Sequence, residues 1–378
     1  MRVVYLSNGN IPSRWAHTFQ VMKMAEALAA QVGELELVTS RSLWPSAANR
    51  ADLSRWYGVS PSLRVVRLPV RLFAGDFYTH YDDPRFDQAA ALYARRRRPD
   101  LVFSRSLGAG LRCAVRGLPT VIETHVPAGA RTSVSLRRCA ALPALRALVT
   151  VTDALRDDWV AAGVRADRIH VWPDAVDLEH FHDAPTAREA RSRLGLPQEG
   201  ALAVYCGHFY EEKGVGTLID AARRLEKATV LLVGGWPADI ARVRDRARDC
   251  ETLRLAGFVP NEDVPLHLAA ADVLVLPNSA RFPQARTTSP LKLFEYMAAR
   301  RPIVATRIPA LEGLLRHGHN AWTVAPDDPE ALAEGIEHVL ASPELAARLA
   351  DRAWQDVQGY TWRRRAADLL ALAAAERR

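Results

Sequence analysis

Short apolar segments alternate with helical patterns along almost the whole chain, and this alternation limits the folds that the chain can adopt. A strand whose neighbours along the chain are helices pairs in parallel, and the helices then cover both faces of the sheet. The predicted strands fall in two sets, residues 3–6, 35–38, 101–103, 120–122, 148–151 and 169–171, and then residues 202–205, 230–233, 273–276 and 303–305. The sequence therefore predicts two α/β domains in tandem.

The boundary between the two sets is a short segment with proline and aspartate. The first alternation ends between Pro173 and Asp177, and a polar segment, residues 180–193, leads into the second set. A chain of 378 residues is long enough for two domains with separate cores. We predict a first domain at residues 1–177 and a second that begins at residue 178. Ligands of such sheets bind at the carboxyl ends of the strands, so a cleft between the domains is the expected site.

Composition predicts a cytoplasmic protein without a membrane span or a metal site. No apolar run approaches the roughly 20 residues that a transmembrane helix needs. Residues 1–6 form too short an apolar run for a signal peptide and are predicted to be part of a strand. The four cysteines are scattered and lack the spacing of metal ligands, which fits a reduced cytosol.

The net charge of +7 bears on the partners of the chain. Only four of the 50 cationic residues are lysines, so the basic balance reflects an Arg- and Ala-rich composition rather than nucleic-acid binding. There is no zinc-finger spacing and no basic helix interleaved with aromatic residues, and we expect no nucleic-acid partner. Attraction to anionic lipid head groups or phosphorylated substrates stays open, and with it peripheral contact at the inner face of the cell membrane. The oligomeric state is left open.

The segment from Thr287 to Ala298 carries the strongest functional signal. Pro290 has no backbone N–H and suits the first turn of a helix. Helix starts expose free N–H groups that bind phosphate, and here these belong to Ser289, Leu291 and Lys292. Glu295 follows one turn later, at a distance suited to a ribose diol. The segment predicts a nucleotide site, and the alternative is a buried helix whose Glu295 caps a neighbour.

The same segment resembles a known family. Residues 289–306 read Ser-Pro-Leu-Lys-Leu-Phe-Glu-Tyr-Met-Ala-Ala-Arg-Arg-Pro-Ile-Val-Ala-Thr and resemble the signature of the retaining GT-B glycosyltransferases of family 4. That signature has two glutamates eight residues apart, of which the first touches the donor sugar and the second binds the donor ribose. Glu295 matches the second glutamate, whereas Thr287 stands in place of the first.

The resemblance covers most of the chain, weakly before residue 120 and strongly from about 170 to 325. It implies a GT-B architecture, in which two Rossmann-like parallel-sheet domains of the α/β class face each other across a cleft. On this basis we expect the second, nucleotide-sugar domain at residues 178–358. The final helix, at residues 359–378, is expected to cross back onto the first, acceptor-side domain.

The loop after strand 202–205 holds the predicted grip on the donor diphosphate. The family has Gly-Arg, four residues and then Lys-Gly at this place. Here Gly207 and Lys213 keep that frame, but His208 replaces the arginine. The resemblance implies a catalytic role for Lys213 and a donor-binding role for His208. Histidine is only partly charged near neutral pH, so diphosphate binding is expected to weaken as pH rises. The alternative is a surface lysine and a loop histidine.

Two segments of the first domain add predicted site residues. His125 lies just after strand 120–122, where a family histidine faces the donor sugar and is needed for activity. The resemblance implies a catalytic role for His125, by a hydrogen bond to a sugar hydroxyl rather than as a base, and a structural histidine is the alternative. The loop after the first strand usually holds a Gly-Gly pair, for which Trp15 and Ala16 stand here, preceded by Arg14. We expect contact with the acceptor or diphosphate, such as Arg14 with an acceptor phosphate, or else packing at the domain interface.

Two further stretches have less specific signals. Residues 255–260 resemble the family segment whose backbone reads the nucleobase, which assigns Phe258 and Val259 to the donor. Backbone contacts leave no side-chain signature, so the base stays open. Residues 40–85 mix aromatic residues with proline, glycine and polar residues and are predicted to be irregular. They are interpreted as an acceptor- or membrane-facing surface, or as loops folded onto the domain.

The resemblance implies a retaining glycosyltransferase that moves a sugar from a UDP- or GDP-sugar to a hydroxyl of a glycan, lipid-linked or small-molecule acceptor. From the family, we expect the acceptor to belong to bacterial polysaccharide synthesis. No Asp-x-Asp motif occurs, and we expect no metal and no cofactor. Thr287 and His208 motivate one alternative, a catalytically silent GT-B scaffold; a GT-B sugar-nucleotide epimerase is another. A nicotinamide-dependent oxidoreductase is disfavoured because Ile219 stands where the third glycine of its fingerprint belongs.

Overall fold

The chain folds into two compact units. The structure is a computed structural model and describes residues 1–13, 15–42, 52–71, 83–129 and 142–375. Contacts group Met1–Asp174 with Trp362–Arg378 in one unit, called here the N-terminal unit. Ala175–Thr361 form the other, the C-terminal unit.

A parallel sheet of seven strands forms the centre of the N-terminal unit, in the order β3-β2-β1-β4-β5-β6-β7. Its strands are β1 (Arg2–Asn10), β2 (Glu34–Ser42), β3 (Val65–Arg71), β4 (Leu101–Ser104), β5 (Thr120–Thr124), β6 (Leu145–Thr150) and β7 (Ile169–Val171). From β1 the chain continues to β2 and β3 on one side of the sheet, and then returns to β4 and continues to β7 on the other side. The connections therefore change direction between β1 and β4. That divergence is the switch point at which ligands of such sheets bind.

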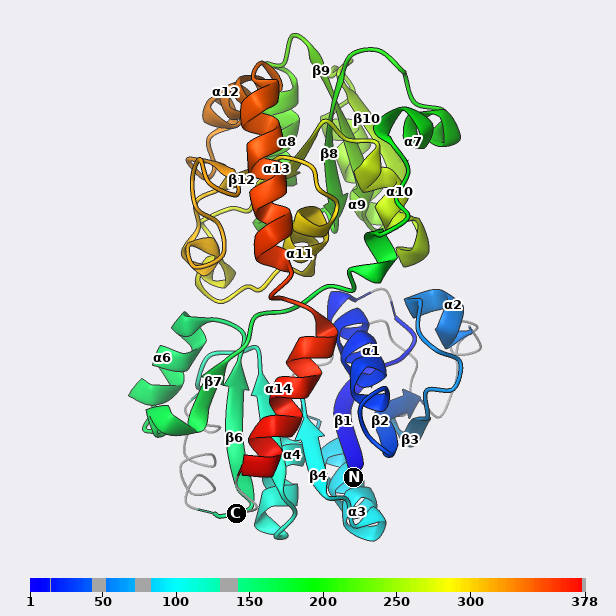
Figure 1. Cartoon of the computed structure of the whole chain (residues 1–378), viewed down its shortest axis with the longest axis vertical. Coiled ribbons are helices and arrows are strands. Elements are labelled where there is room, and N and C mark those ends of the chain that lie inside the picture. Colours follow the sequence, from blue (N-terminus) through cyan, green and yellow to red (C-terminus); the bar gives the residue numbers. More distant parts are fainter. Residues whose placement is uncertain (14, 43–51, 72–82, 130–141, 376–378) are drawn as a thin grey trace. The chain divides into compact units, whose positions relative to one another are not determined.

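Helices cover both faces of this sheet. They are α1 (Ala16–Ala29), α2 (Leu53–Tyr57), α3 (Pro84–Arg97), α4 (Leu107–Val115), α6 (Asp153–Ala161) and α14 (Trp362–Ala375). Phe86 of α3 and Cys113 of α4 pack against Val4 and Val38 on one face. Since strand side chains alternate, neighbours such as Tyr5 point to the other face, which α1 covers. The C-terminal helix α14 lies against α1 (Figure 1).

The edge of this sheet differs from the sequence prediction. Residues 40–85 were expected to be irregular, yet they contain helix α2 and strand β3. Asp52 caps α2 by accepting a hydrogen bond from Ser54 N at 2.9 Å. β3 contains Pro69, which has no N–H for a sheet bond and would disrupt a central strand. It is tolerated because β3 pairs only with β2, at the edge.

The C-terminal unit is built on a second parallel sheet, of six strands in the order β10-β9-β8-β11-β12-β13. Its strands are β8 (Ala201–Gly207), β9 (Ala228–Gly234), β10 (Leu253–Gly257), β11 (Val273–Leu276), β12 (Ile303–Thr306) and β13 (Trp322–Val324). The sequence prediction lacked β10 and β13, which are the two edge strands. β10 is only partly buried and β13 has three residues, so neither forms the continuous apolar run of a central strand.

Helices also cover both faces of the second sheet. They are α7 (Ala187–Leu194), α8 (Val215–Ala222), α9 (Pro237–Arg246), α10 (Val264–Ala269), α11 (Leu291–Ala298), α12 (Pro329–Leu340) and α13 (Pro343–Val357). β8 shows the layering. Leu202 and Val204 enter the core that includes α11, and Ala203 and Tyr205 enter the core that includes α8 and α12. A central strand buried on both faces is what its unbroken apolar sequence predicts.

Local sequence fixes where several helices begin. Asp83 and Asp328 each accept hydrogen bonds from two backbone N–H groups of α3 and α12, and proline follows each as the first helical residue. Thr186 and Glu189 form a reciprocal capping box at α7. Among the helices of the described residues, none combines the length and the apolar composition that crossing a membrane requires.

Candidate functional site

The carboxyl end of β8 brings together several predicted site residues of the C-terminal unit. Lys292, in the first turn of α11, donates a hydrogen bond to Tyr205 Oη at 2.6 Å, and its Nζ lies 3.9 Å from the centroid of that ring. Gly207 ends β8 with φ of 146°, and a Cβ built on it would lie 2.6 Å from Lys292 Nζ. The positive φ favours glycine at this strand end, whereas the flexible end of the Lys292 side chain could move away from an added Cβ.

Lys213 lies close enough to Lys292 for their charges to interact. Burial lowers the pKa of Lys292 to about 7, and the positive charge of Lys213 contributes to the lowering. Cys206, Glu295 and Glu212 act in the opposite direction and raise this pKa. Burial likewise lowers the pKa of Lys213, while Glu212 opposes that shift. Two poorly hydrated cations at one strand end are a favourable place for an anion, because an anion would compensate both.

Lys213 is held at this place by a close backbone approach. It ends the short 3-10 helix η4 (Glu211–Lys213), and Gly214 follows with φ of 71° before α8 begins. A Cβ on Gly214 would lie 1.6 Å from Pro277 O, just after β11. The lysine therefore sits between the ends of β8 and β11, where the strand order of the second sheet diverges.

The start of α11 is the predicted phosphate seat. Pro290 is the N-cap, with φ of −79° and ψ of 115°, and so lies at the start of the helix, one residue before its first turn. The helix begins at Leu291, so the N–H groups of its first turn, including those of Leu291 and Lys292, have no acceptor within the helix. The partly buried Ser289 precedes the cap, and Thr287 N donates to Gln284 O at 3.1 Å at the end of η6 (Pro283–Arg286).

Glu295 and His208 lie near the same strand end. Glu295 is partly buried, and its charge contributes to raising the pKa of the Cys206 thiol, mainly raised by burial. The His208 ring stacks on Tyr210, with centroids 5.1 Å apart. His208 O accepts a hydrogen bond from Tyr205 Oη at 2.5 Å, which links this loop through Tyr205 to Lys292.

The two residues assigned to the nucleobase are placed farther along the sheet. Phe258 and Val259 follow β10, which is separated from β8 by β9 in the strand order. Phe258 is one of the exposed large hydrophobic residues, at 41%, whereas Val259 packs against the buried core. The structure therefore leaves Phe258 accessible to a planar ligand, and its role stays a prediction.

His125 lies in the N-terminal unit, directly after β5, and its side chain is only 14% exposed. Its Nε2 lies 2.6 Å from Oε1 of Glu123, which is fully buried in β5. Glu123 also accepts hydrogen bonds from Gln20 Nε2 of α1 and from Arg365 Nη1 of α14, both at 2.7 Å. Arg105 Nε lies 3.9 Å from the same carboxylate. We call these five side chains the Glu123 cluster.

Charges set the protonation states in the Glu123 cluster. Burial alone would raise the pKa of Glu123, but Arg365, His125 and Arg105 together hold that pKa well below its usual range. Burial lowers the pKa of His125, Arg105 lowers it further, and Glu123 opposes both. The cluster therefore favours an ionised glutamate and a neutral imidazole. A neutral imidazole that hydrogen-bonds a carboxylate through one nitrogen leaves the other as an acceptor.

The loop before α1 holds the remaining predicted residues. Trp15 is the N-cap of α1, and its carbonyl oxygen accepts hydrogen bonds from Thr18 N at 3.0 Å and Thr18 Oγ1 at 2.8 Å. Ala16 is the exposed first residue of the helix. Arg14 lies outside the described residues. Instead of a glycine pair, this chain uses a hydrogen-bonded turn to begin α1.

Sequence reasoning missed partners of the predicted residues. Tyr205 accepts a hydrogen bond from Lys292, and the charge of Glu212 acts on both lysines. Glu123 hydrogen-bonds His125, and Arg365 hydrogen-bonds Glu123, yet none of these four residues was assigned a role. A signal existed for Glu123, because a carboxylate inside an otherwise apolar buried strand requires a partner. For Arg365 the sequence carried no comparable signal, since its helix holds three consecutive arginines.

Comparison with known proteins bears on both units. The model for Glycosyltransferase Family 4 matches residues 19–180, and the model for Glycosyl transferases group 1 matches residues 200–342. The chain is 29% identical to alpha-D-kanosaminyltransferase of Streptomyces kanamyceticus, over 55% of this chain and 54% of the relative. It is 26% identical to D-inositol 3-phosphate glycosyltransferase of Streptomyces coelicolor, over 52% of this chain and 48% of that relative. The chain thus spans about half the length of the curated relatives that it matches.

Solved structures share the fold over the whole chain. HepE of Anabaena in complex with UDP has a TM-score of 0.75 and 17% identity, covering 98% of this chain and 100% of that one. Sucrose-phosphate synthase of Thermosynechococcus elongatus has a TM-score of 0.78 and 21% identity, covering 99% and 98%. These likenesses show a GT-B fold. Because the two family models together cover most of the sequence, the chain belongs to the family 4, group 1 glycosyltransferases.

Proposed function

We propose that the chain is a retaining glycosyltransferase that takes a sugar from a UDP- or GDP-sugar and transfers it to a hydroxyl group of a glycan, a lipid or a small molecule. The observation that carries this proposal is the pair of partly buried lysines, Lys213 and Lys292, beside the start of α11. Poorly hydrated cations and free helical N–H groups together suit a diphosphate leaving group.

In the proposed reaction the bond between the anomeric carbon and the diphosphate oxygen breaks, and a bond to the acceptor oxygen forms on the same face of the sugar. Lys213, Lys292 and the first N–H groups of α11 stabilise the departing diphosphate. Glu295 hydrogen-bonds the donor ribose, and His125 hydrogen-bonds a sugar hydroxyl. Glu123 fixes the orientation and tautomer of His125. The acceptor proton leaves with the diphosphate, and no metal takes part.

Similar proteins of known structure support a sugar-nucleotide donor. HepE of Anabaena was solved in complex with UDP, and also with UDP-glucose. Relatives include an alpha-D-kanosaminyltransferase and D-inositol 3-phosphate glycosyltransferases, which differ in donor or acceptor. The proposal therefore names the donor class and leaves the sugar and acceptor to experiment.

Slow donor hydrolysis tests this function without knowledge of the acceptor. The purified full chain would be incubated with a panel of UDP- and GDP-sugars, with and without EDTA, and the freed sugar followed by NMR before it mutarotates. We expect one donor to release sugar with its anomeric configuration kept, unaffected by EDTA. The variant Lys213→Met is expected to lose the activity, whereas Lys227→Met, at an exposed lysine of the same unit, keeps it. Inverted sugar, or EDTA-sensitive release, would contradict the proposal.

A catalytically silent GT-B scaffold is the second candidate, favoured by Thr287 in place of the first family glutamate. In that case a nucleoside diphosphate binds, but no donor of the panel is hydrolysed, whether or not a cell extract that contains candidate acceptors is added. The replacement Thr287→Glu separates the two candidates further. If the wild type is inactive and Thr287→Glu hydrolyses a donor, then the threonine at this position is the cause of the missing activity.

A further inference from the structure

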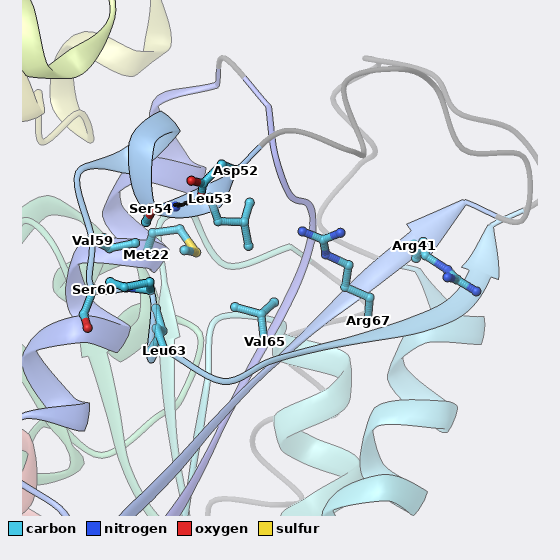
Figure 2. Close-up of a pocket in the computed structure, with 11 residues that line it drawn as sticks. Met22, Arg41, Asp52, Leu53, Ser54, Val59, Ser60, Leu63, Val65 and Arg67 are labelled. Atoms are coloured by element: carbon cyan, nitrogen blue, oxygen red, sulfur yellow. Dashed lines mark hydrogen bonds between the residues drawn. The ribbon is translucent and has the colours of Figure 1, made fainter.

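A cavity of about 490 Å³ lies at the β3 edge of the N-terminal unit, apart from the Glu123 cluster. It is open to solvent on one side and is lined by α1, the end of β2, helix α2, the segment after α2 and β3 itself (Figure 2). Its volume lies within the roughly 300–1,000 Å³ of small-molecule sites. None of the residues given a role in the proposed transfer reaction lines it, although most of the lining falls within residues 40–85.

One part of the cavity wall is apolar. Met22 of α1 is fully buried, Val59 is 7% exposed, and Val65 of β3 is partly buried. Leu53 and Leu63 add to this wall from α2 and from the residues before β3. Such a surface suits the carbon skeleton of a small molecule rather than a fully hydrated ion.

The opposite part carries two arginines from neighbouring strands. The register pairs Thr39 with Arg67 and Arg41 with Pro69, so both arginines point to the same face of the sheet as Val65. Figure 2 shows the Arg67 guanidinium reaching toward α2, whereas the Arg41 side chain lies beyond Arg67 and extends away from it, at the margin of the cavity. Burial lowers the pKa of Arg67, and the positive charge of Arg41 lowers that pKa further. Tyr57 acts in the opposite direction and raises it. Two cations thus act on one another beside the cavity.

Hydroxyl groups and one carboxylate complete the lining. Ser54 and Ser60 line the cavity from α2 and from the segment that follows it. Asp52 is the one acidic residue among the lining residues, and it is exposed and accepts hydrogen bonds from Ser54 N at 2.9 Å and Ser54 Oγ at 2.7 Å. This carboxylate is engaged in capping α2. Among the described residues that line the cavity, the two arginines and Asp52 leave one positive charge in excess.

We propose that this cavity binds a sugar-sized molecule that carries a phosphate or carboxylate group. Arg67 holds the anionic group, Arg41 attracts it, the apolar wall covers the carbon skeleton, and the serines bind hydroxyl groups. A guanidinium offers two parallel N–H donors that match both phosphate and carboxylate oxygens. The proposal concerns binding in the N-terminal unit and goes beyond the transfer reaction, so it does not require donor turnover.

Calorimetric titration of the full chain tests it. The probes are glucose 6-phosphate and glucuronate, with glucose as the neutral match and inorganic phosphate as the anion alone. We expect either sugar anion to bind the wild type and glucose to bind at least about tenfold more weakly, because a charge-assisted hydrogen bond is lost. The replacement Arg67→Gln is expected to weaken binding by about tenfold or more. Arg112→Gln, at an exposed arginine of α4 in the same unit, leaves binding unchanged.

Further variants keep the outcome clear. Arg41→Gln changes an exposed side chain and tests the site even if Arg67→Gln unfolds the unit. Binding of the sugar anion that persists in Lys292→Met excludes the donor site as its source. Equal binding by wild type and Arg67→Gln would overturn the proposal, as would no binding by the wild type. Flotation with phosphatidylglycerol vesicles that depends on Arg67, without binding of the soluble probes, would replace it with a lipid site.

Discussion

At the scale of single residues, Lys292 is the group whose chemistry most directly reports the proposed site. Its pKa near 7 means that it loses its charge in the range where most assays are run. Below pH 7 the charged amine attracts a diphosphate, and above it the neutral amine does not. A terminal phosphate is already ionised above its own pKa of about 6, so its charge changes little between pH 7 and 9.

We therefore predict that the affinity for the bound nucleoside diphosphate falls by about tenfold from pH 7 to pH 9, measured by calorimetry. The variant Lys292→Met is expected to bind weakly at all pH values and to show no such slope. His208→Gln is expected to keep it. A slope that survives in Lys292→Met but disappears in His208→Gln would assign the titration to the histidine, as the sequence alone suggested.

Single residues also show where sequence reasoning stops. Lys213, Lys292 and Glu295 were found because they occupy fixed positions in a family motif. Arg365 was not, because its partner Glu123 is 242 residues away and only folding brings the two together. A long-range pair of this kind leaves no periodicity and no local motif, so the sequence predicts that a buried charge needs a partner but not which residue supplies it.

At the scale of elements, Gly214, between η4 and α8, approaches the backbone just after β11 and so constrains the site. We predict that Gly214→Ala lowers the free energy of unfolding by about 3 kcal/mol or more, because the new methyl group would meet Pro277 O and the backbone has φ of 71°. Gly195→Ala is the matched control, with φ of 64° and nothing within 4 Å of the added Cβ. It is expected to lower stability by only about 1 kcal/mol in urea unfolding. Equal losses of unfolding free energy in the two variants would mean that the loop moves to accommodate the new methyl group.

The packing of α14 on the N-terminal unit makes a second prediction at this scale. Glu123→Gln removes the charge that balances the buried Arg365, and breaking such a pair costs about 3–5 kcal/mol. The double variant Glu123→Gln/Arg365→Met should lose less than the sum of the two single variants, with a coupling of about 2 kcal/mol in urea unfolding. The exposed pair Arg165–Asp167 is the control, and its removal should change little. Additive effects would show that the Glu123 cluster does not tie α14 to β5.

Elements differ in how well the sequence predicts them. The central strands were found because each is an apolar run, as in β11, where all four residues are buried. β3 was missed because its arginines and Pro69 interrupt that pattern. These residues are tolerated at an edge, and two of the arginines in this region line the proposed anion cavity. Arg67, one of the residues that concealed β3 from prediction, is therefore also the β3 arginine that lines the cavity.

At the scale of the whole molecule, the proposed reaction uses residues of both units. His125 and the Glu123 cluster belong to the N-terminal unit, and Lys213, Lys292 and Glu295 belong to the C-terminal unit. The family and the fold follow from the sequence and the comparisons. The donor and acceptor do not, because backbone contacts and single side-chain changes such as Thr287 decide them, and the chain spans about half of its curated relatives.

The most direct test is thermal-shift binding of the full chain to UDP, GDP, ADP and dTDP without added metal. A ligand at 100 times its dissociation constant adds about 2.7 kcal/mol of stability, which is readily measured. The account predicts that UDP or GDP stabilises the wild type and Lys227→Met, and that Lys213→Met loses most of this effect. A folded protein that none of the four diphosphates stabilises would contradict the assignment of the lysines and the start of α11 to a nucleotide donor.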